Sequence, residues 1–180
     1  TNASITSNQA IAPDGTQTAD LIIANSTDQP RLERGISSTT ATSTVSWFVK
    51  KYNARYVGIA QFNSNSTQPN VIFDLDNGSV IRVESNTTQS IIPLANGWYK
   101  ISMSYSHFAT DSNNIFKLTI SNGSTAFTAS NIGDGVYCWG SNYIDLAYDT
   151  SYIPALSNQA VTRTVDFCHI GSGLQNILNT

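Results

Sequence analysis

The stretch VIFDLDNGSVIRVE, residues 71–84, holds two short apolar segments separated by the pair Asn77-Gly78. Asn-Gly tolerates the positive φ angles of a type I′ turn, which joins two antiparallel strands without splaying them. The stretch therefore predicts a β-hairpin. Two further pairs mark similar turns: Asn122-Gly123 between residues 115–121 and 124–129, and Asn96-Gly97 between residues 93–95 and a strand at 98–106.

Several segments place apolar side chains at every second position, as half-buried strands require. Trp47 shares one face with Val45 and Val49, so we expect it in the core, and we expect the same of Trp98 at the start of its strand. The alternating segments are residues 44–50, 98–106 and 115–121, and further strands are expected at 19–24, 31–37, 55–62, 136–144 and 161–167.

Roughly eleven short strands with almost no amphipathic helix are typical of a sandwich or barrel. We predict an all-β fold, a two-sheet antiparallel jelly-roll β-sandwich. Its 180 residues suit one domain, which we place at residues 1–168, with 169–180 as a C-terminal tail or the start of a linker. Because the chain begins with neither Met nor a signal-peptide pattern, we expect it to be a module of a longer protein.

The composition excludes several classes of partner. Charged residues make up only 12% of the chain, whereas Ser, Thr and Asn fill 61 of 180 positions. The net charge is −3 and the nine Lys and Arg residues are scattered, so we expect no nucleic-acid partner. No apolar run approaches the ~20 residues that cross a bilayer, so we expect no membrane insertion.

Six motifs occur in a fixed order along almost the whole chain. They are APDGTQTADLI at 12–22, TVSWFVK at 44–50, FDLDNGSV at 73–80, LANGWYKISMSYS at 94–106, GVYCWGSN at 135–142 and TSYIPALSNQAVTRTVD at 150–166. In this order they resemble the concanavalin A-like jelly-roll module of phage tail fibre and tail spike proteins, which is related in fold to carbohydrate-binding modules. The chain departs from that family after Trp-Gly, where Ser141 to Asp145 replace its usual Ala-Gln-Leu-Glu.

The resemblance implies a location in the virion tail, outside the host cell when the protein acts. It also implies attachment to host-surface polysaccharide or oligosaccharide and assembly as a homotrimer within the parent fibre. The resemblance further implies that the Thr-Arg-x-x-Asp segment ends the module. The Glu of the family's Ala-Gln-Leu-Glu is missing here, so a contact that the family makes through that carboxylate does not carry over to this chain.

Glycoside hydrolysis normally needs two carboxyl groups about 5 to 9 Å apart, one of them with a raised pKa. The chain has only two Glu residues, Glu33 and Glu84, in separate segments. Asp74 and Asp76 share a strand face, but they border the Asn-Gly turn, where Asp commonly bonds backbone amides. We therefore assign this pair to the turn and expect no hydrolase.

Two other catalytic arrangements are weaker still. A lyase would need a base beside a cation, and His107 with Tyr105 and Arg82 is the one set to consider. Cys168 and His169 are adjacent, so they would face opposite sides of a strand and not each other. Hence we expect a protein that is not an enzyme.

Sugar binding instead needs aromatic faces that stack on a pyranose, flanked by side chains that bond its hydroxyls. The chain is rich in both, and rings out of step with apolar neighbours or in loops are the best candidates. Trp139 and Tyr143 lie four residues apart in an extended segment, so we expect both on one sheet face about 13 Å apart. The candidate sugar-binding residues are Trp139, Tyr143, Phe48, Tyr52, Tyr56 and Tyr148.

No cofactor is required by these motifs, although Ca²⁺ is a candidate ligand because it prefers oxygen donors in loops. Asp14 would contribute, with Asp145 or Asp166 brought near it; the alternative is that Asp14 only forms a turn. Cys138 and Cys168, the only cysteines, allow either one disulfide or two buried thiols.

The sequence thus predicts a non-catalytic carbohydrate-binding module of a phage tail fibre or spike that recognises host-surface polysaccharide. Two alternatives stay open. One is a structural spacer or trimerisation module that binds no sugar, and the other is a polysaccharide depolymerase.

Overall fold

The computed structural model describes residues 2–36, 42–62, 70–83, 87–106, 114–123 and 129–152, and the structural statements below concern these residues. They form eleven strands and one short 3-10 helix: β1 (Ala3–Ala10), β2 (Ala19–Ala24), β3 (Arg31–Ile36), β4 (Thr42–Lys51), β5 (Tyr56–Phe62), β6 (Asn70–Asp74), β7 (Ser79–Val83), β8 (Thr87–Pro93), η1 (Ala95–Gly97), β9 (Trp98–Ser106), β10 (Asn114–Ser121) and β11 (Gly135–Ile144).

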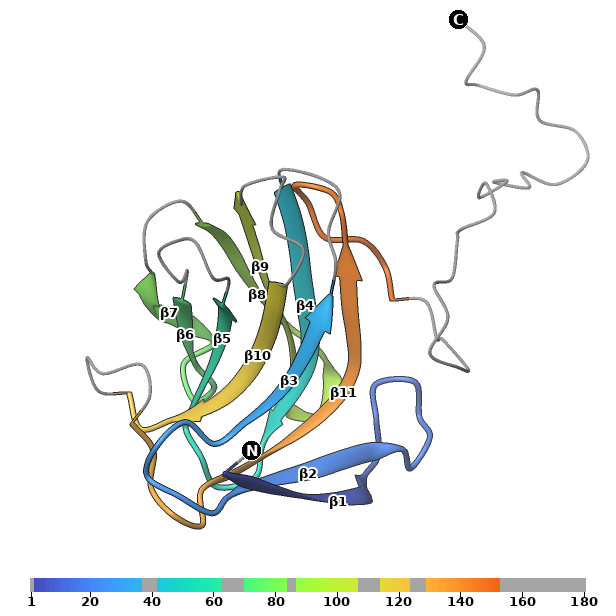
Figure 1. Ribbon diagram of the computed structural model, residues 1–180. Coiled ribbons are helices and arrows are strands. Elements are labelled where there is room, and N and C mark those ends of the chain that lie inside the picture. The colour runs from blue at the N-terminus through green and yellow to red at the C-terminus, as the bar shows by residue number, and fades with distance from the viewer. Residues whose placement is uncertain are drawn as a thin grey trace, which may run out of the picture.

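The strands make two antiparallel sheets that pack face to face (Figure 1). The six-stranded sheet has the order β1-β2-β11-β4-β9-β8, and the five-stranded sheet has the order β3-β10-β5-β6-β7. The predicted all-β, two-sheet β-sandwich is therefore confirmed. No helix among the described residues is long and apolar enough to cross a bilayer.

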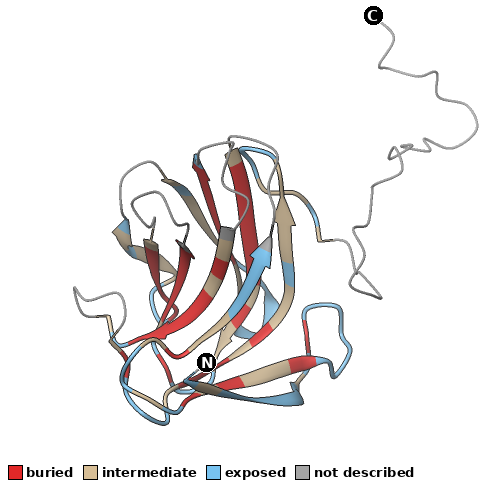
Figure 2. Cartoon of the chain, in the orientation of Figure 1, coloured by how far each residue is buried: buried red, intermediate tan, exposed pale blue. Residues whose placement is uncertain are grey.

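The core lies between the sheets, and Figure 2 shows buried residues along β4, β5, β6 and β10. Val45, Trp47 and Val49 point into it from β4, as the alternation predicts, and Trp47 is only 8% exposed. Phe116 and Leu118 point into it from β10, on the facing sheet. Burial of these side chains is the main force that holds the layers together.

The Asn77-Gly78 hairpin is confirmed, with Asp74 of β6 paired to Ser79 of β7. The loop differs from a two-residue type I′ turn, since within it only Gly78, at φ +60°, has a positive φ. The physical reason is the Asp74 carboxylate, which accepts the backbone amides of Asp76 and Asn77 and so closes a longer loop.

The other two Asn-Gly pairs have different outcomes. Asn96 and Gly97 both have positive φ and turn the chain from β8 into β9, as predicted. Gly123 also has positive φ after β10, but residues 124–128, the second arm of the predicted hairpin, lie outside the described residues. The expected strand at 161–167 and the expected domain boundary at 168 lie outside them too.

Two strands were not expected from the sequence. β1 and β8 are the edge strands of the six-stranded sheet. β1 is exposed along most of its length, and exposed strands need no apolar alternation. Their pairing to β2 and β9 rests on backbone hydrogen bonds, which leave no signature in side-chain type.

Candidate functional site

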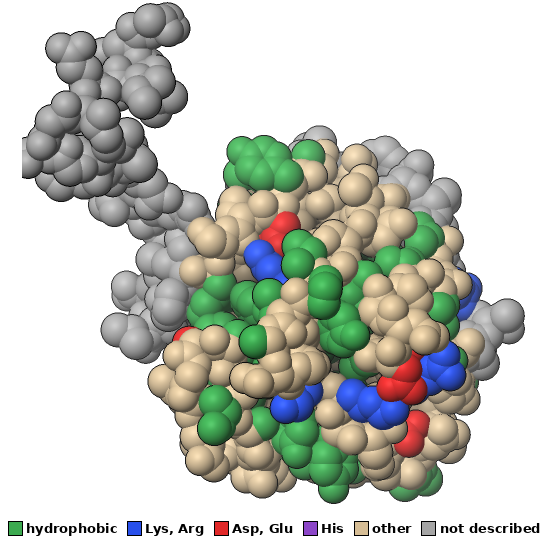
Figure 3. Space-filling view, turned by 180° about the vertical axis from the view of Figure 1, so that it is seen from behind, with side chains coloured by type: hydrophobic (Ala, Val, Ile, Leu, Met, Phe, Trp, Pro, Cys, Tyr) green, Lys and Arg blue, Asp and Glu red, His purple; other side chains and the backbone are tan. Residues whose placement is uncertain are grey.

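The outer face of the six-stranded sheet carries two adjacent rows of aromatic and basic side chains. The strand register places them opposite one another on β11, β4 and β9, where neighbours on one face are within contact range. β4, β8 and β9 lie behind the five-stranded sheet in Figure 1, so Figure 3 looks onto this side, where hydrophobic and basic side chains lie together. We call these six residues the outer patch: Tyr137, Lys50 and Trp98 in one row, and Trp139, Phe48 and Lys100 in the next.

The row that contains Trp139 is an aromatic cluster. The Phe48 and Trp139 rings pack edge to face with centroids 5.2 Å apart. The Tyr152 ring lies 4.7 Å from Trp139 and 6.0 Å from Phe48. The Lys100 ammonium is 5.8 Å from the Phe48 ring centre, a cation–π distance. Sequence reasoning missed Tyr152 because no strand alternation surrounds it; the signal that could have found it is its Thr-Ser-Tyr-Ile-Pro motif.

The loop at residues 11–18, between β1 and β2, closes one side of the outer patch. The indole N–H of Trp98 donates to the Ile11 carbonyl at 3.1 Å, and that of Trp139 donates to the Thr18 hydroxyl at 3.1 Å. Trp98 is 2% exposed, so its predicted burial is confirmed. It packs with Ala12 and Ala19 in a small second core on the outer face.

Tyr52 extends the patch at its most exposed end. Its ring packs edge to face against Tyr137, with centroids 5.6 Å apart, and the residue is 50% exposed. Tyr137 and Trp139 are two residues apart on β11 and therefore share the outer face. One side of the patch is thus formed by a series of three neighbouring rings, those of Tyr52, Tyr137 and Trp139.

The expectation that Trp139 and Tyr143 share one face is wrong. β11 contains a bulge between Trp139 and Asn142, with Gly140 at φ +58°, and one extra residue inverts the inside-outside alternation. Tyr143 therefore turns inward, where its ring lies 4.9 Å from Phe116. Its hydroxyl is 2.8 Å from the Ser43 hydroxyl.

Tyr56 and Tyr148, the remaining predicted residues, are not residues of the outer patch. Tyr56 belongs to β5 of the other sheet, where the Arg55 guanidinium sits 5.1 Å from its ring centre. Tyr148 follows β11 and is 63% exposed. Of the six candidate residues, the structure brings Phe48 and Trp139 into direct contact. Tyr52 joins them indirectly, because it packs against Tyr137 of the outer patch.

Residues 145–152, here called the covering segment, fold back over the outer face next to the patch. The Thr44 hydroxyl donates to the Leu146 carbonyl at 2.7 Å, and the Ser46 hydroxyl donates to the Asp149 carboxylate at 3.0 Å. Lys100 pairs with Asp149 at 2.7 Å. Thr44 and Ser46 are fully buried in consequence, whereas Tyr52, at the other end of the outer patch, is 50% exposed.

The described residues do not assemble the expected calcium site. The Asp14 carboxylate accepts the amide and the hydroxyl of Thr16, which lowers the pKa of Asp14, and the alternative prediction of a turn is confirmed. Asp145 accepts hydrogen bonds from Ser43 and Tyr143. Within the described ranges no three His, Cys, Asp or Glu residues group to hold a metal, and Asp166 lies outside them.

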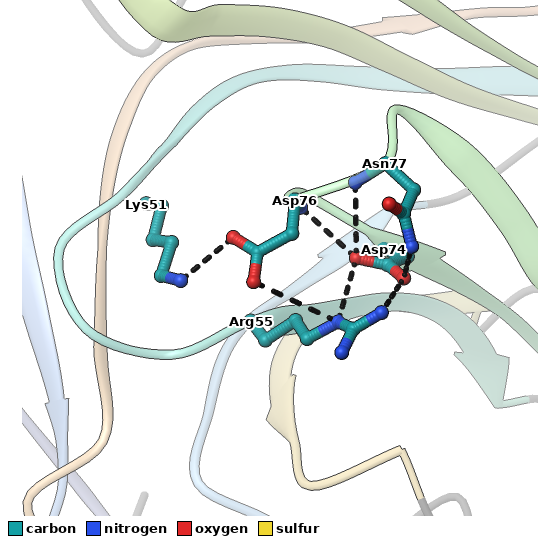
Figure 4. A network of polar contacts seen from close by, with 5 residues as sticks. All are labelled: Lys51, Arg55, Asp74, Asp76 and Asn77. Carbon is teal, nitrogen blue, oxygen red and sulfur yellow. Dashed lines mark hydrogen bonds and ion pairs between the residues drawn. The ribbon is translucent and has the colours of Figure 1, made fainter.

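Asp74 and Asp76 belong to an ionic network between the β4–β5 and β6–β7 loops (Figure 4). Arg55 donates to both oxygens of the buried Asp74, at 3.0 and 2.7 Å, and holds the pKa of that carboxyl well below its usual range. Lys51 pairs with Asp76 at 2.6 Å. The assignment of this pair to the turn is confirmed for Asp74, whose carboxylate caps the loop.

The other catalytic candidates lie only in part within the described residues. Tyr105 is 2% exposed in the core, and burial raises its pKa further above neutral, so it is no accessible base. His107, Cys168 and His169 lie outside the described residues. Cys138 is buried and forms no disulfide in the described part of the chain.

Comparison with known proteins gives little beyond the fold. No family model and no curated protein matches the chain. Among solved structures it is similar to TmCBM61, a carbohydrate-binding module determined in complex with β-1,4-galactotriose. The identity is 9%, the match covers 76% of this chain and 87% of that one, and the TM-score is 0.28. A TM-score this low supports no argument about ligands.

Proposed function

We propose that this protein is a non-catalytic carbohydrate-binding module that binds saccharide at the Tyr52 end of the outer patch. The observation that carries the proposal is a series of three rings on the outer face of a sheet, the exposed Tyr52 and the partly buried Tyr137 and Trp139. Aromatic faces of this kind stack on the apolar faces of pyranose rings, while nearby polar groups bond the hydroxyls. Lys50 and Thr18 supply such groups beside the rings.

We also propose that the protein is not catalytic, and the lowered pKa values of two of its carboxyl groups support this. A general acid for glycoside cleavage needs a raised pKa. The pKa of Asp74 is lowered by Arg55, and that of Glu33 is lowered by Arg31. Both groups are therefore held in the ionised form, which cannot donate a proton.

The proposal also covers the biological setting of the protein. The order of the six motifs supports a module of a phage tail fibre or spike, in which it would recognise polysaccharide on the host surface. Several copies in one homotrimeric fibre would strengthen weak individual binding through effective concentration.

The test is a glycan array and affinity electrophoresis of the purified 180-residue protein, with and without Ca²⁺. The variants are Tyr52→Ala, Tyr137→Ala and Trp139→Ala, with Tyr148→Ala as the matched control because it removes an exposed tyrosine outside the patch. We expect each patch variant to weaken binding about ten-fold and the control to leave it unchanged. Near-ultraviolet circular dichroism checks that every variant is folded.

The outcomes separate the alternatives. Binding that survives all three patch variants in folded protein would place the sugar site elsewhere. No binding to any bacterial polysaccharide, even when the protein is displayed as a multimer, would leave the structural spacer as the better function. Release of reducing ends or unsaturated uronate would identify a depolymerase.

A further inference from the structure

The geometry points to a saccharide that carries one negative charge, such as a uronic acid, with Lys50 as the residue that selects for the charge. This inference rests on the proposed function, because it concerns the ligand of the same patch. The observations that carry it are the position of Lys50 between aromatic residues and the state of the lysines around it.

Lys50 lies at the centre of one row of the outer patch. The register places Tyr137 of β11 on one side of it and Trp98 of β9 on the other. A Cβ on Gly97 would lie 4.0 Å from its Cε, so its aliphatic stem lies beside the turn between β8 and β9. The residue is partly buried, as a lysine is when its aliphatic stem lies along the surface and its ammonium reaches water.

The neighbouring lysines are already neutralised. Lys51 pairs with Asp76 at 2.6 Å, and Lys100 pairs with Asp149 at 2.7 Å. The Lys50 ammonium, by contrast, forms no hydrogen bond and no ion pair with any residue of the described ranges. Among these residues, the outer patch therefore carries one uncompensated positive charge, in a chain whose net charge is −3.

One uncompensated cation beside rings that stack on a sugar matches a sugar with one anionic substituent. A carboxylate would form a charge-assisted hydrogen bond with the Lys50 ammonium, which is stronger than a bond to a neutral hydroxyl. A neutral saccharide would stack on the same rings and leave the cation unpaired. The carboxylate of a uronic acid and a sulfate half-ester share this charge, and the test distinguishes them.

The experiment measures binding of the intact protein to polyglucuronate and to the same polymer after reduction of its carboxyl groups. Carrageenan, a galactan that carries sulfate half-esters and no carboxylate, provides the sulfate arm, and sodium acetate is added as a competitor that carries a carboxylate without a sugar. The variants are Lys50→Gln, Lys50→Arg and, as the matched control, Lys51→Gln, which removes the same charge one position along β4. Thermal unfolding confirms that each variant is folded.

We expect the unmodified protein to prefer the charged polymer over its reduced form by about ten-fold. Lys50→Gln should abolish this preference and reduce the salt dependence of binding, and it should weaken binding of the charged polymer about ten-fold more than binding of the reduced polymer. Lys50→Arg should retain most of the preference, and Lys51→Gln should change it less than two-fold.

Equal binding of both polymers, or a preference that survives Lys50→Gln, overturns the role of Lys50. The proposed function would stand in that case if Trp139→Ala still abolished binding. Binding of the sulfated polymer in preference to the uronate overturns the carboxylate assignment. Failure to bind any of the polymers overturns this inference, whereas the proposed function fails only if the glycan array also shows no binding.

Discussion

The Lys100 ammonium on β9 lies 2.7 Å from the Asp149 carboxylate of the covering segment, and both side chains are mostly buried, at 15% and 18% exposure. The same ammonium donates to the Thr150 carbonyl at 2.6 Å, while Asp149 also accepts the Ser46 hydroxyl. This pair therefore joins the segment after β11 to the middle of the six-stranded sheet. It also sets one border of the outer patch.

Replacing Asp149 with Asn should destabilise the protein by about 2 kcal/mol, because Lys100 would be left with a partly buried, unpaired charge. Hydrogen exchange over residues 145–152 should become faster. Urea unfolding measures the first effect and exchange mass spectrometry the second. The double variant Asp149→Asn with Lys100→Met should recover part of the loss, and no recovery would show that the charge pair is not its cause.

Stability should fall in acid, in part through Asp74. Arg55 and the loop amides lower the pKa of this carboxyl, so its contribution is complete above its unfolded pKa near 4 and is lost as pH falls towards the folded value. Asp74→Asn should cost about 3 kcal/mol at pH 7 and about 1 kcal/mol less at pH 3, where the unfolded carboxyl is largely protonated and the folded one is still ionised. Urea unfolding at both pH values tests this.

Glu33→Gln is the comparison for that experiment. Its carboxylate pairs with Arg31 at 2.7 Å, but its side chain is 35% exposed, so its loss should cost about 0.5 kcal/mol. If the Asp74 and Glu33 variants had equal effects, burial of the Arg55–Asp74 pair would not be the source of the acid sensitivity.

Gly140→Ala should destabilise the protein by about 2 kcal/mol. Gly140 has φ +58°, and an added Cβ would lie 3.0 Å from the Phe48 ring. Gly133→Ala is the matched control, since it has a similar φ of +89° but no atom within 4 Å, and it should cost about half as much. Equal losses would mean that backbone strain alone, without the ring contact, determines the effect.

Cys138 should be inert to thiol reagents in the folded protein. Burial raises the pKa of its thiol to about 12, and only the thiolate reacts. In a Cys168→Ser background, Ellman's reagent at pH 8 should modify less than 5% of the protein within an hour, and all of it after addition of 6 M guanidinium. Rapid modification without denaturant would contradict the buried position of β11.

Much of the sandwich was predictable from sequence because its central strands are half-buried. The alternation of Val45, Trp47 and Val49 reports directly on a core at one face. Asn96-Gly97 marks a turn because both residues adopt positive φ. β1 and β8 were not predicted, since edge strands form through backbone pairing and place few demands on side-chain type.

The candidate site was less predictable. Phe48 and Trp139 were found because they are out of step with buried neighbours, but their contact with Tyr152 depends on the path of the covering segment. The bulge in β11 is the reason why the prediction that Trp139 and Tyr143 share one sheet face was wrong. A bulge adds one residue without changing composition or hydropathy, so local alternation cannot reveal where it occurs.

The same bulge lets β11 carry one extra residue without changing which face of the sheet the residues beyond it occupy. Loss of Ser141 alone would restore regular pairing, with Gly140 opposite Trp47 and Asn142 still opposite Ser46. Tyr143 would still lie opposite Val45 and keep its place in the core. A single-codon deletion would therefore remove a kink at the sheet surface and leave the packed interior unchanged. Relatives that differ in length by one residue at this point would share the same core.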